Sequence, residues 1–382
     1  MSAPRLIQLS STAEIRSVAS DWDGLWLRSA VTVPVARAEC ISNWIEHCEP
    51  RAEVRALAVE HDGRLVAALP LVGSRLKGLM SVGDLPSNVW SWAGDLLLDS
   101  LADSRSALDV LIKGVKELAW PLIWINQAPY EAPYWRQFIA AAEAQQVQVE
   151  TRESFRVPIV AIDHDWAGYQ RGWSKGHRRQ MRRMSERTLD AGGAILTVHR
   201  EIDADQVEPL LRRGFAIEDS GWKGAAGTSV LKSPERFALH LREAQQAAAK
   251  GALQLSFLEL QGQPIAFQYG WNCKGVYHSF KVGYDEAFAE FTPGQVLRCR
   301  LLERFFADPT QRLVDFLGPV TGATARWSTA TYPVGRIVLS TGPLAGRVVL
   351  QVYRTVWPWI QRMRRRSTIS PATDPVSSSN PA

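Results

Sequence analysis

The sequence has few cysteines, and their spacing excludes the common structural uses of that residue. The 382 residues include four cysteines, at positions 40, 48, 273 and 299, with no CxxC pair among them. Zinc sites need Cys or His ligands at short, regular spacings, and disulfide-built folds are short and rich in cysteine. We therefore expect no metal site and no disulfide framework, but buried, reduced thiols in a cytoplasmic protein.

Long apolar runs are also missing. No stretch reaches the roughly 20 apolar residues that a membrane span needs, and the N-terminal MSAPRLIQLSSTAEIRS has no apolar signal region. No serine stands in a Gly-x-Ser-x-Gly elbow, which argues against a serine hydrolase. These absences favour a soluble protein that works without a covalent serine intermediate.

The bulk composition is that of an ordinary globular protein. Hydrophobic residues make up 46% of the chain and charged residues 22%, with a formal net charge of +5. This mild excess of positive charge does not by itself indicate a nucleic-acid partner. The 15 tryptophans are a high number, and we expect some of them to line a binding groove.

A faint internal repeat divides the chain in two. RALAVEHDGRLVAALPL around Gly63 aligns with QLSFLELQGQPIAFQYG around Gly262, which pairs Glu60 with Glu259. Each copy has the alternation of a strand, a Gly turn and a second strand. A duplication therefore predicts a first domain over 1–160 and a second over 161–345, followed by an apolar and basic helix and a disordered tail over 346–382.

The periodicity predicts helices packed on mostly antiparallel, hairpin-rich sheets, an α+β (mixed α/β) fold. Hairpins are expected at 54–72 and 253–272, and single strands at LIWINQ, 275–284, RLVDFLG and RIVLS. Helices are expected at 12–28, 104–118, 132–146, 174–190, 233–250 and 293–307. Ser233 and Gly251 have the chemistry of a cap and a stop for the helix at 233–250.

The segment FKVGYDEAFAEFTPGQVLRCRLL, from Phe280 to Leu302, is the most informative in the chain. A strand ends at Tyr284, an acidic loop follows, and Thr292-Pro293-Gly294 opens a helix. We expect Thr292 to cap this helix and Gln295 to complete a capping box. A strand that feeds a helix N-terminus through a small-residue turn is suited to bind a phosphate, because free N–H groups and the helix dipole both favour an anion.

Two segments resemble the signature regions of a known family. GFAIEDSGWKGAAGTSV (214–230) and FKVGYDEAFAEFTPGQVL (280–297) resemble CelD-like (BioF-type) acetyltransferases of the GNAT superfamily, relatives of the FemAB-like tandem-GNAT proteins. The resemblance covers roughly residues 150–340 and the first half only in outline. It implies tandem GNAT-like domains, each a mostly antiparallel sheet flanked by helices.

The resemblance also implies a donor and its place. In the superfamily the pantetheine arm of an acyl-CoA lies along the fourth strand, and its diphosphate rests on the turn and helix that follow. Mapped onto this sequence, the cofactor-binding residues are Lys281, Val282, Thr292, Pro293, Gly294 and Gln295. FTPGQV supplies one glycine where the family's phosphate loop reads Arg/Gln-x-x-Gly-x-Gly/Ala, so another activated donor, such as an aminoacyl-tRNA, stays open.

Acyl transfer needs a group that takes the acceptor's proton. Glu218, Asp285 and Asp315 are the acidic candidates for this base, and each also has a structural interpretation as a turn residue or a satisfied buried acid. Tyr284 could protonate the leaving thiolate, as tyrosines do in many GNAT enzymes. The residues alone do not decide among these four.

Substrate contacts are expected on both sides of a cleft between the halves. Trp222 and Lys223 lie in a glycine-rich segment and are suited to contact a sugar, adenine, phosphate or carboxylate. Trp90 and Trp92 would come from the first half. Arg178 belongs to a basic stripe in SKGHRRQMRRMSERTLDAGG that is either a solvated helix face or a site for a phosphorylated acceptor or tRNA.

The sequence therefore predicts an acyl-CoA-dependent, GNAT-type N-acetyltransferase that uses acetyl-CoA or another acyl-CoA, and no metal. By analogy with CelD-like proteins, the acceptor is a small molecule, a sugar or a sugar nucleotide of cell-surface polysaccharide synthesis. One alternative is a FemAB-like aminoacyl-tRNA-dependent transferase, the only case in which a nucleic acid would bind. A non-catalytic binding protein on a GNAT scaffold is the other. The basic helix past residue 346 could associate weakly with a membrane surface.

Overall fold

The computed structural model describes residues 3–76, 78–88, 91–342 and 346–355. The first half contains β1 (Arg5–Leu9), α1 (Thr12–Ser17), α2 (Ala19–Arg28), η1 (Pro34–Ala36), α3 (Ala38–Cys48), β2 (Ala56–His61), β3 (Arg64–Leu69), β4 (Val72–Leu76), β5 (Met80–Asp84), β6 (Leu97–Leu98), α4 (Ser104–Glu117), β7 (Leu122–Ala128), α5 (Pro133–Ala144) and β8 (Gln148–Ala161). The second contains α6 (Trp166–Arg171), α7 (Lys175–Asp190), β9 (Ala194–His199), α8 (Ala204–Asp219), α9 (Trp222–Ala225), η2 (Val230–Lys232), α10 (Pro234–Ala249), β10 (Leu253–Leu260), β11 (Gln263–Cys273), β12 (Val276–Tyr284), η3 (Glu286–Phe291), α11 (Pro293–Phe306), β13 (Leu313–Asp315), α12 (Gly322–Ala325) and β14 (Ala330–Ser340).

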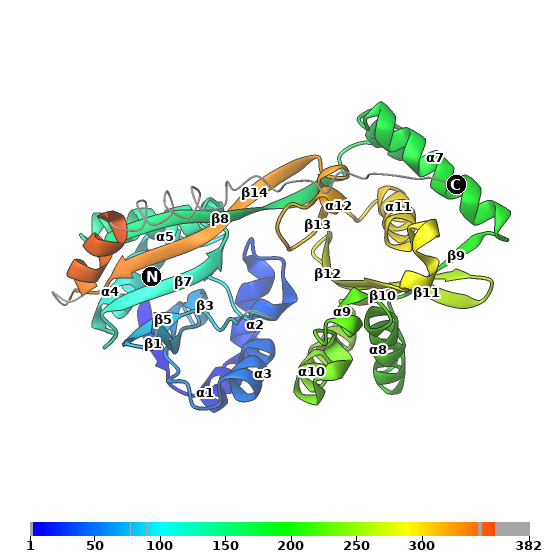
Figure 1. Ribbon diagram of the computed structural model, residues 1–382. Coiled ribbons are helices and arrows are strands. Elements are labelled where there is room, and N and C mark those ends of the chain that lie inside the picture. The colour runs from blue at the N-terminus through cyan, green and yellow to red at the C-terminus, as the bar shows by residue number, and fades with distance from the viewer. Residues whose placement is uncertain (1–2, 77, 89–90, 343–345, 356–382) are drawn as a thin grey trace, which may run out of the picture.

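Two sheets organise these elements, and the larger one joins the halves. A four-stranded sheet has the order β1-β2-β3-β6, and a ten-stranded sheet has the order β4-β5-β7-β14-β8-β13-β12-β11-β10-β9. The long strands β8 and β14 pair from Gln148 with Ser340 to Ile159 with Ala330, and Figure 1 shows them bridging the molecule. Because β14 also pairs with β7, the last strand of the chain completes the sheet of the first half.

The two hairpins of the internal repeat are alike in detail. β2–β3 turns at Asp62-Gly63 and β10–β11 at Gln261-Gly262, all with positive φ. Each hairpin shifts register at the aligned place, between Val59 and Glu60 in one and between Leu258 and Glu259 in the other. A β-bulge at the same position in both halves supports a duplication more strongly than the sequence similarity does.

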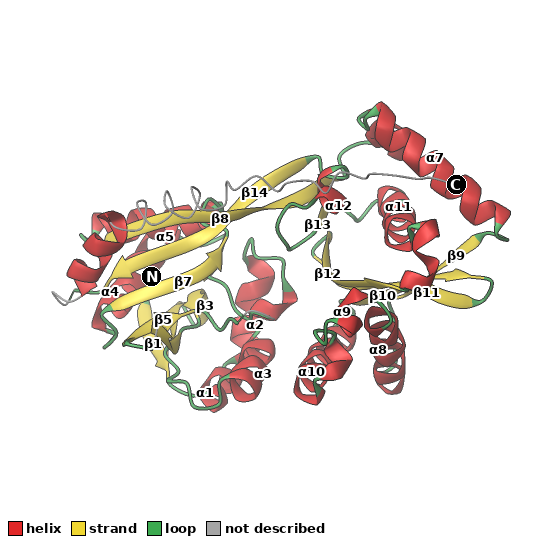
Figure 2. Ribbon diagram, in the orientation of Figure 1, coloured by secondary structure: helices red, strands yellow, loops and turns green. Residues whose placement is uncertain are grey.

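Helices cover both faces of the second-half sheet. α8 and α10 pack on one face of β10 and β11, and α11 lies on the opposite face (Figure 2). Apolar side chains of α2 and α3 join those of α8, α10 and β11 in one buried cluster, so that Trp22 and Trp44 share a core with Phe215 and Trp271. The halves are therefore held by a continuous core as well as by a continuous sheet.

The structure confirms the fold class and most of the expected elements. The hairpins and the helices α4, α5, α7, α10 and α11 lie where the periodicity placed them. Ser233 caps α10 by accepting from the Arg236 N–H, and Gly251 follows with φ +64°. The single helix expected over 12–28 is wrong: it is broken at Val18, where φ is −108°. Residues 346–355 are helical, as expected, and the rest of the predicted tail lies outside the described residues.

The two halves differ where a donor would bind. In the second half β12 is nine residues long and α11 follows it closely. In the first half β6, which pairs with β3 as β12 pairs with β11, has two residues. Among the described residues, a long strand that leads through a short 3-10 helix, η3, into an α-helix is therefore found at this place only in the second half. No helix in the described part of the chain combines the length and apolarity that crossing a bilayer requires.

Candidate active site

The strand β12 loses its partner halfway along one edge. It pairs in parallel with β13 at three positions, ending at His278 opposite Asp315. Beyond this point the chain after β13 turns back towards β8, with Phe316 N–H donating to the Pro158 carbonyl. The edge from Ser279 to Tyr284 has no strand partner in the described part of the chain. Unpaired backbone groups along a strand edge can accept an extended ligand as an added strand.

The helix α11 begins differently from what we predicted. Thr292 adopts a left-handed conformation, with φ 47° and ψ 53°, and its side chain makes no capping hydrogen bond. Its hydroxyl donates to the Phe291 carbonyl instead, and the Gln295 side chain accepts from the Trp327 indole N–H at 2.7 Å. The predicted cap and capping box are therefore wrong. Pro293 has no N–H, and the N–H groups of Gln295 and Val296 donate to the Thr292 carbonyl, so the Gly294 N–H is the first-turn donor that an anion could use.

Lys281 and Gly283 lie on the face of β12 that meets α8. A Cβ added at Gly283 would lie 2.8 Å from the Glu218 Cα, so helix and strand approach too closely here for any other residue. Lys281 lines a cavity of about 190 Å³ on this face, and burial lowers the pKa of its ammonium group. The backbone of Val282 lies at the same place, with its carbonyl 3.4 Å from the Lys223 ammonium.

Glu218 and Lys223, which are close in sequence and were predicted for different roles, form an ion pair. Glu218 is buried, and its Oε1 accepts from Lys223 Nζ at 2.6 Å. Its Oε2 accepts from the Val230 N–H at 3.2 Å. Both oxygens thus have partners within the protein, and the pair fixes the segment after α8 against β12.

The other charged groups of this cavity come from α10. His240 is buried, and its Nδ1 lies 2.9 Å from Glu243 Oε2. His240 and Arg236 line the cavity together with Lys281, Lys223 and Glu218, so that three basic side chains face one carboxylate there. Such a lining can bind a carboxylate or a phosphate, but all of its residues belong to the second half.

Asp285 and Tyr284 lie at the end of β12. Asp285 Oδ1 accepts from the Ala287 N–H at 3.0 Å and so caps the short helix η3. Tyr284 is half-buried, and a Cβ added at Gly294 would lie 3.7 Å from its ring. The two residues thus flank the start of α11, at the phosphate end of the expected donor site.

Asp315 lies at the other end, where β12 and β13 part. It is buried, and its Oδ2 accepts from the Tyr332 hydroxyl at 2.8 Å while its Oδ1 accepts from the Leu317 N–H at 2.7 Å. Burial raises the pKa of this carboxyl group to about 6. A carboxyl group that titrates near neutral pH has the protonation behaviour of a general base.

Asp315 opens into a cavity between the two halves. This cavity has a volume of about 530 Å³ and is lined by residues of both halves, among them Asp95, Tyr134, Arg156, His278, Asp315 and Tyr332. Asp95 is buried and accepts from the Tyr134 hydroxyl and the Trp135 indole N–H, each at 2.9 Å. Burial raises its pKa to about 6 and lowers that of His278 to about 4. Two buried carboxyl–phenol pairs therefore face one cavity.

Sequence reasoning missed Asp95, Tyr134, Tyr332 and His278. Asp95 stands just before an apolar run, as Asp315 stands within one, and this similarity was the only local signal. Tyr332 meets Asp315 through the strand pairing of β8, β13 and β14, and Tyr134, in α5, meets Asp95 in the segment before β6; the sequence revealed neither contact.

The remaining predicted residues lie apart from each other. Arg178, on α7, donates to the Arg171 carbonyl at 3.1 Å and does not line the cavity between the halves. Trp92 packs edge-on against Phe280, with ring centroids 6.0 Å apart, which links the halves near β12. Trp90 lies outside the described residues, and Trp222 is described by its backbone alone, at the start of α9.

The predicted catalytic residues are therefore divided between two places. Six residues of extended strand separate His278, opposite Asp315, from Tyr284, which corresponds to roughly 20 Å. One reacting atom cannot touch both ends. The described residues contain no cluster of three His, Cys, Asp or Glu side chains that could hold a metal ion.

A comparison with known protein families gives a match to the half of the chain that contains β12 and α11. Residues 175–327 match a family described as an acetyltransferase (GNAT) domain. The second half therefore contains a GNAT domain. No curated protein sequence matched the chain.

Solved structures show how far the fold extends. A crystal structure of FemX is similar with a TM-score of 0.58 and 11% identity, over 91% of this chain and 99% of that one. A protein of unknown function from Bacteroides thetaiotaomicron gives 0.54 and 10%, over 88% and 100%. The C-terminal domain of a putative lysylphosphatidylglycerol synthetase from Agrobacterium fabrum gives 0.50 and 10%, over 90% and 98%. At these identities the similarity shows a shared fold that includes the first half, and not a shared substrate.

Proposed function

We propose that this GNAT-type acyltransferase uses an acyl-CoA donor and an acceptor amine or hydroxyl that enters the cavity between the halves. One observation carries the proposal: the pairing of β12 with β13 ends at Asp315, where the open strand edge and the cavity meet. The pantetheine arm would pair with the edge from Ser279 to Tyr284, and the diphosphate would bind at the uncapped first turn of α11.

The chemistry needs one proton to leave the acceptor and one to reach the leaving group. The acceptor nitrogen or oxygen attacks the thioester carbonyl and gives its proton to the Asp315 carboxylate. The C–S bond then breaks, and the thiolate takes a proton from the Tyr332 hydroxyl, which already donates to Asp315. The proton held by Asp315 restores Tyr332, so that the enzyme returns to its starting state without a covalent intermediate.

The lining of the cavity supports a polar, compact acceptor. Acid and phenol groups from both halves can bind several hydroxyl or amine groups at once. This agrees with a sugar or amino-sugar acceptor in the cytoplasm, the class expected for cell-surface polysaccharide synthesis. Glu218, by contrast, is held in an ion pair with the Lys223 ammonium group and lines the smaller cavity formed by the second half alone, which makes it the weaker candidate for the base.

Thiol release from acetyl-CoA and longer acyl-CoAs, measured with a panel of amino sugars, sugars and sugar nucleotides, tests the proposal. Asp315→Asn should lower kcat by about 10²–10⁴-fold, the usual contribution of a general base, and leave acyl-CoA affinity unchanged. Glu218→Gln is the comparison variant. If acyl-CoA is never turned over, or if Asp315→Asn is fully active, the proposal is wrong and a different activated donor or base must be sought.

A further inference from the structure

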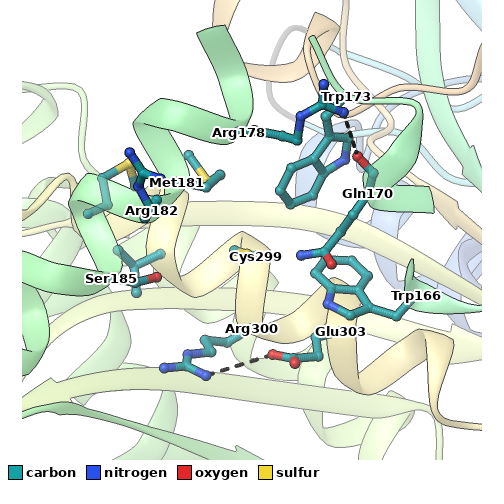
Figure 3. A pocket seen from close by; sticks show the side chains of 12 residues that line it. Trp166, Gln170, Trp173, Arg178, Met181, Arg182, Ser185, Cys299, Arg300 and Glu303 are labelled. Atoms are coloured by element: carbon teal, nitrogen blue, oxygen red, sulfur yellow. Dashed lines mark hydrogen bonds and ion pairs between the residues drawn. The ribbon is translucent and has the colours of Figure 1, made fainter. Parts of the chain in front are cut away.

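A third cavity lies on the outer side of α11, away from the cavity between the halves. It has a volume of about 440 Å³ and runs between α6–α7 and α11 (Figure 3). We call it the α7–α11 groove. Its lining residues are Trp166, Gln170, Trp173, Arg178, Met181, Arg182, Met184, Ser185, Val296, Cys299, Arg300 and Glu303. This volume falls in the range of natural ligand sites, roughly 300–1,000 Å³.

The floor of the groove is apolar and deformable. Met181 and Met184 from α7 pack in one cluster with Val296 and Cys299 from α11. Trp166 lies at one end of the groove. Methionine is flexible and polarisable, so that such surfaces adapt to hydrocarbon chains of different shape. The thiol of Cys299 has a pKa raised to about 12 by burial, and it therefore acts here as an apolar group.

The rim of the groove is cationic. Arg178 and Arg182 come from α7 and Arg300 from α11. Arg182 lies 3.7 Å from Glu186 with both side chains more than half exposed, and Arg300 lies 3.7 Å from Glu303. Exposed pairs at such distances stabilise little, so that these guanidinium groups keep most of their attraction for an added anion. Guanidinium groups match the oxygens of a phosphate in pairs.

The outer face of α7 extends this positive surface beyond the groove. Its exposed cations are Lys175, Arg178, Arg179, Arg182, Arg183 and Arg187, against the acids Glu186 and Asp190. Leu189 on this helix and Ile195 in the following strand are each 65% exposed. Basic side chains beside protruding aliphatic ones are typical of surfaces that rest on anionic lipid. The peripheral position of α7 leaves this face open (Figure 1).

We propose that the α7–α11 groove binds a phosphorylated lipid, with its hydrocarbon chain on the Met181–Val296 floor and its phosphate between Arg182 and Arg300. The exposed cations of α7 would bring the groove to the anionic membrane that carries such a lipid. This site is separate from the proposed acyl transfer, because its lining shares no residue with the cavity at Asp315.

The test measures binding of farnesyl phosphate, a soluble phosphorylated hydrocarbon, to the full chain, with farnesol and inorganic phosphate as partial ligands. Farnesyl phosphate should bind much more tightly than either. Arg182→Gln/Arg300→Gln should weaken it by about 25-fold, since each basic side chain contributes roughly fivefold. Ser185→Trp, an exposed substitution that fills the groove, should also block it. The matched control is Arg75→Gln/Arg105→Gln, two exposed arginines of the first half.

Sedimentation with vesicles tests whether the protein also binds the anionic lipid of a membrane, and not the free ligand alone. Vesicles of phosphatidylcholine containing phosphatidylglycerol should retain the wild-type protein, and pure phosphatidylcholine should not. Equal binding of farnesol or of inorganic phosphate, or no effect of the groove variants, overturns the proposal. Displacement of farnesyl phosphate by CoA would make the groove a part of the donor site instead. If an RNA duplex binds more tightly than farnesyl phosphate and in a salt-sensitive way, α7 is a nucleic-acid surface.

Discussion

The side chain of Lys274, in the second half, forms hydrogen bonds with the first half. It lies with Gly275 in the tight turn between β11 and β12, both with positive φ. Its ammonium group donates to the carbonyls of Ser29 at 2.9 Å, Val31 at 2.8 Å and Trp26, and it lies 4.3 Å from the Trp26 ring centroid. Replacement by methionine keeps the length of the side chain and removes all three donors.

The expected loss of stability depends on which carbonyl groups lose their hydrogen-bond donor. The Trp26 carbonyl keeps the Ser29 hydroxyl as a partner, but the Ser29 and Val31 carbonyls lose this donor. At about 1.5 kcal/mol for each hydrogen bond to a charged group, Lys274→Met should lower the free energy of unfolding by roughly 3 kcal/mol. With an unfolding entropy of about 2.1 cal/mol/K per residue, this corresponds to a midpoint roughly 4 °C lower if the chain unfolds as one unit.

Calorimetry or urea unfolding monitored by tryptophan fluorescence measures this loss. Lys113→Met, at an exposed position on α4, is the matched control and should leave the midpoint within about 1 °C of the wild type. If Lys274→Met and Lys113→Met unfold at the same midpoint, the hydrogen bonds of Lys274 with the loop after α2 do not stabilise the contact between the halves. The walls of the cavity between the halves would then be less rigidly fixed than we infer.

Three further predictions concern the site itself. Because burial raises the pKa of Asp315 to about 6, the folded protein binds a proton more tightly than the unfolded chain, and the free energy of unfolding should fall by roughly 3 kcal/mol as pH rises from about 4 to 6. Asp315→Asn should flatten this part of a stability–pH profile. An unchanged profile in the variant would contradict the burial argument. If Asp315 is the base, kcat of the wild type should rise with pH through about 6, and a pH-independent rate would assign the proton transfer elsewhere. Gly283→Val would place its Cβ 2.8 Å from the Glu218 Cα, and it should lower the free energy of unfolding by roughly 1–3 kcal/mol. Chemical denaturation would detect this loss. An unchanged free energy would mean that α8 is free to move away from β12.

Local sequence chemistry predicted many of the elements, since each depends on neighbouring residues, but α3, β8 and α8 were not among those expected. The cap at Ser233, the stop at Gly251 and the two Gly turns all behave as their residue types require. Two local predictions failed: the helix over 12–28 is broken at Val18, and the left-handed backbone of Thr292 turns its hydroxyl away from the helix. Propensity alone does not reveal such a turn, because it depends on how η3 approaches α11.

The arrangement of the halves could not be predicted from the sequence, because it depends on long-range pairing. β14 completes the sheet of the first half, and β8 lies between two strands of the second. This exchange brings Tyr332 to Asp315 and places both beside Asp95. Glu218 and Lys223 were predicted for separate roles, and only the structure shows that the two side chains pair with each other.

The affinity for acetyl-CoA, measured by titration calorimetry on Gly294→Leu beside the wild type, tests the central claim most directly. Gly294 lies in the uncapped first turn of α11, and a side chain there would project next to Tyr284 without a clash in the free protein. Gly322→Leu, at an exposed position with open space around it, is the control. A donor that lies along β12 should bind the wild type and the control equally, and Gly294→Leu at least about tenfold more weakly with an unchanged unfolding midpoint. Equal affinity in all three proteins would show that the donor does not bind at α11.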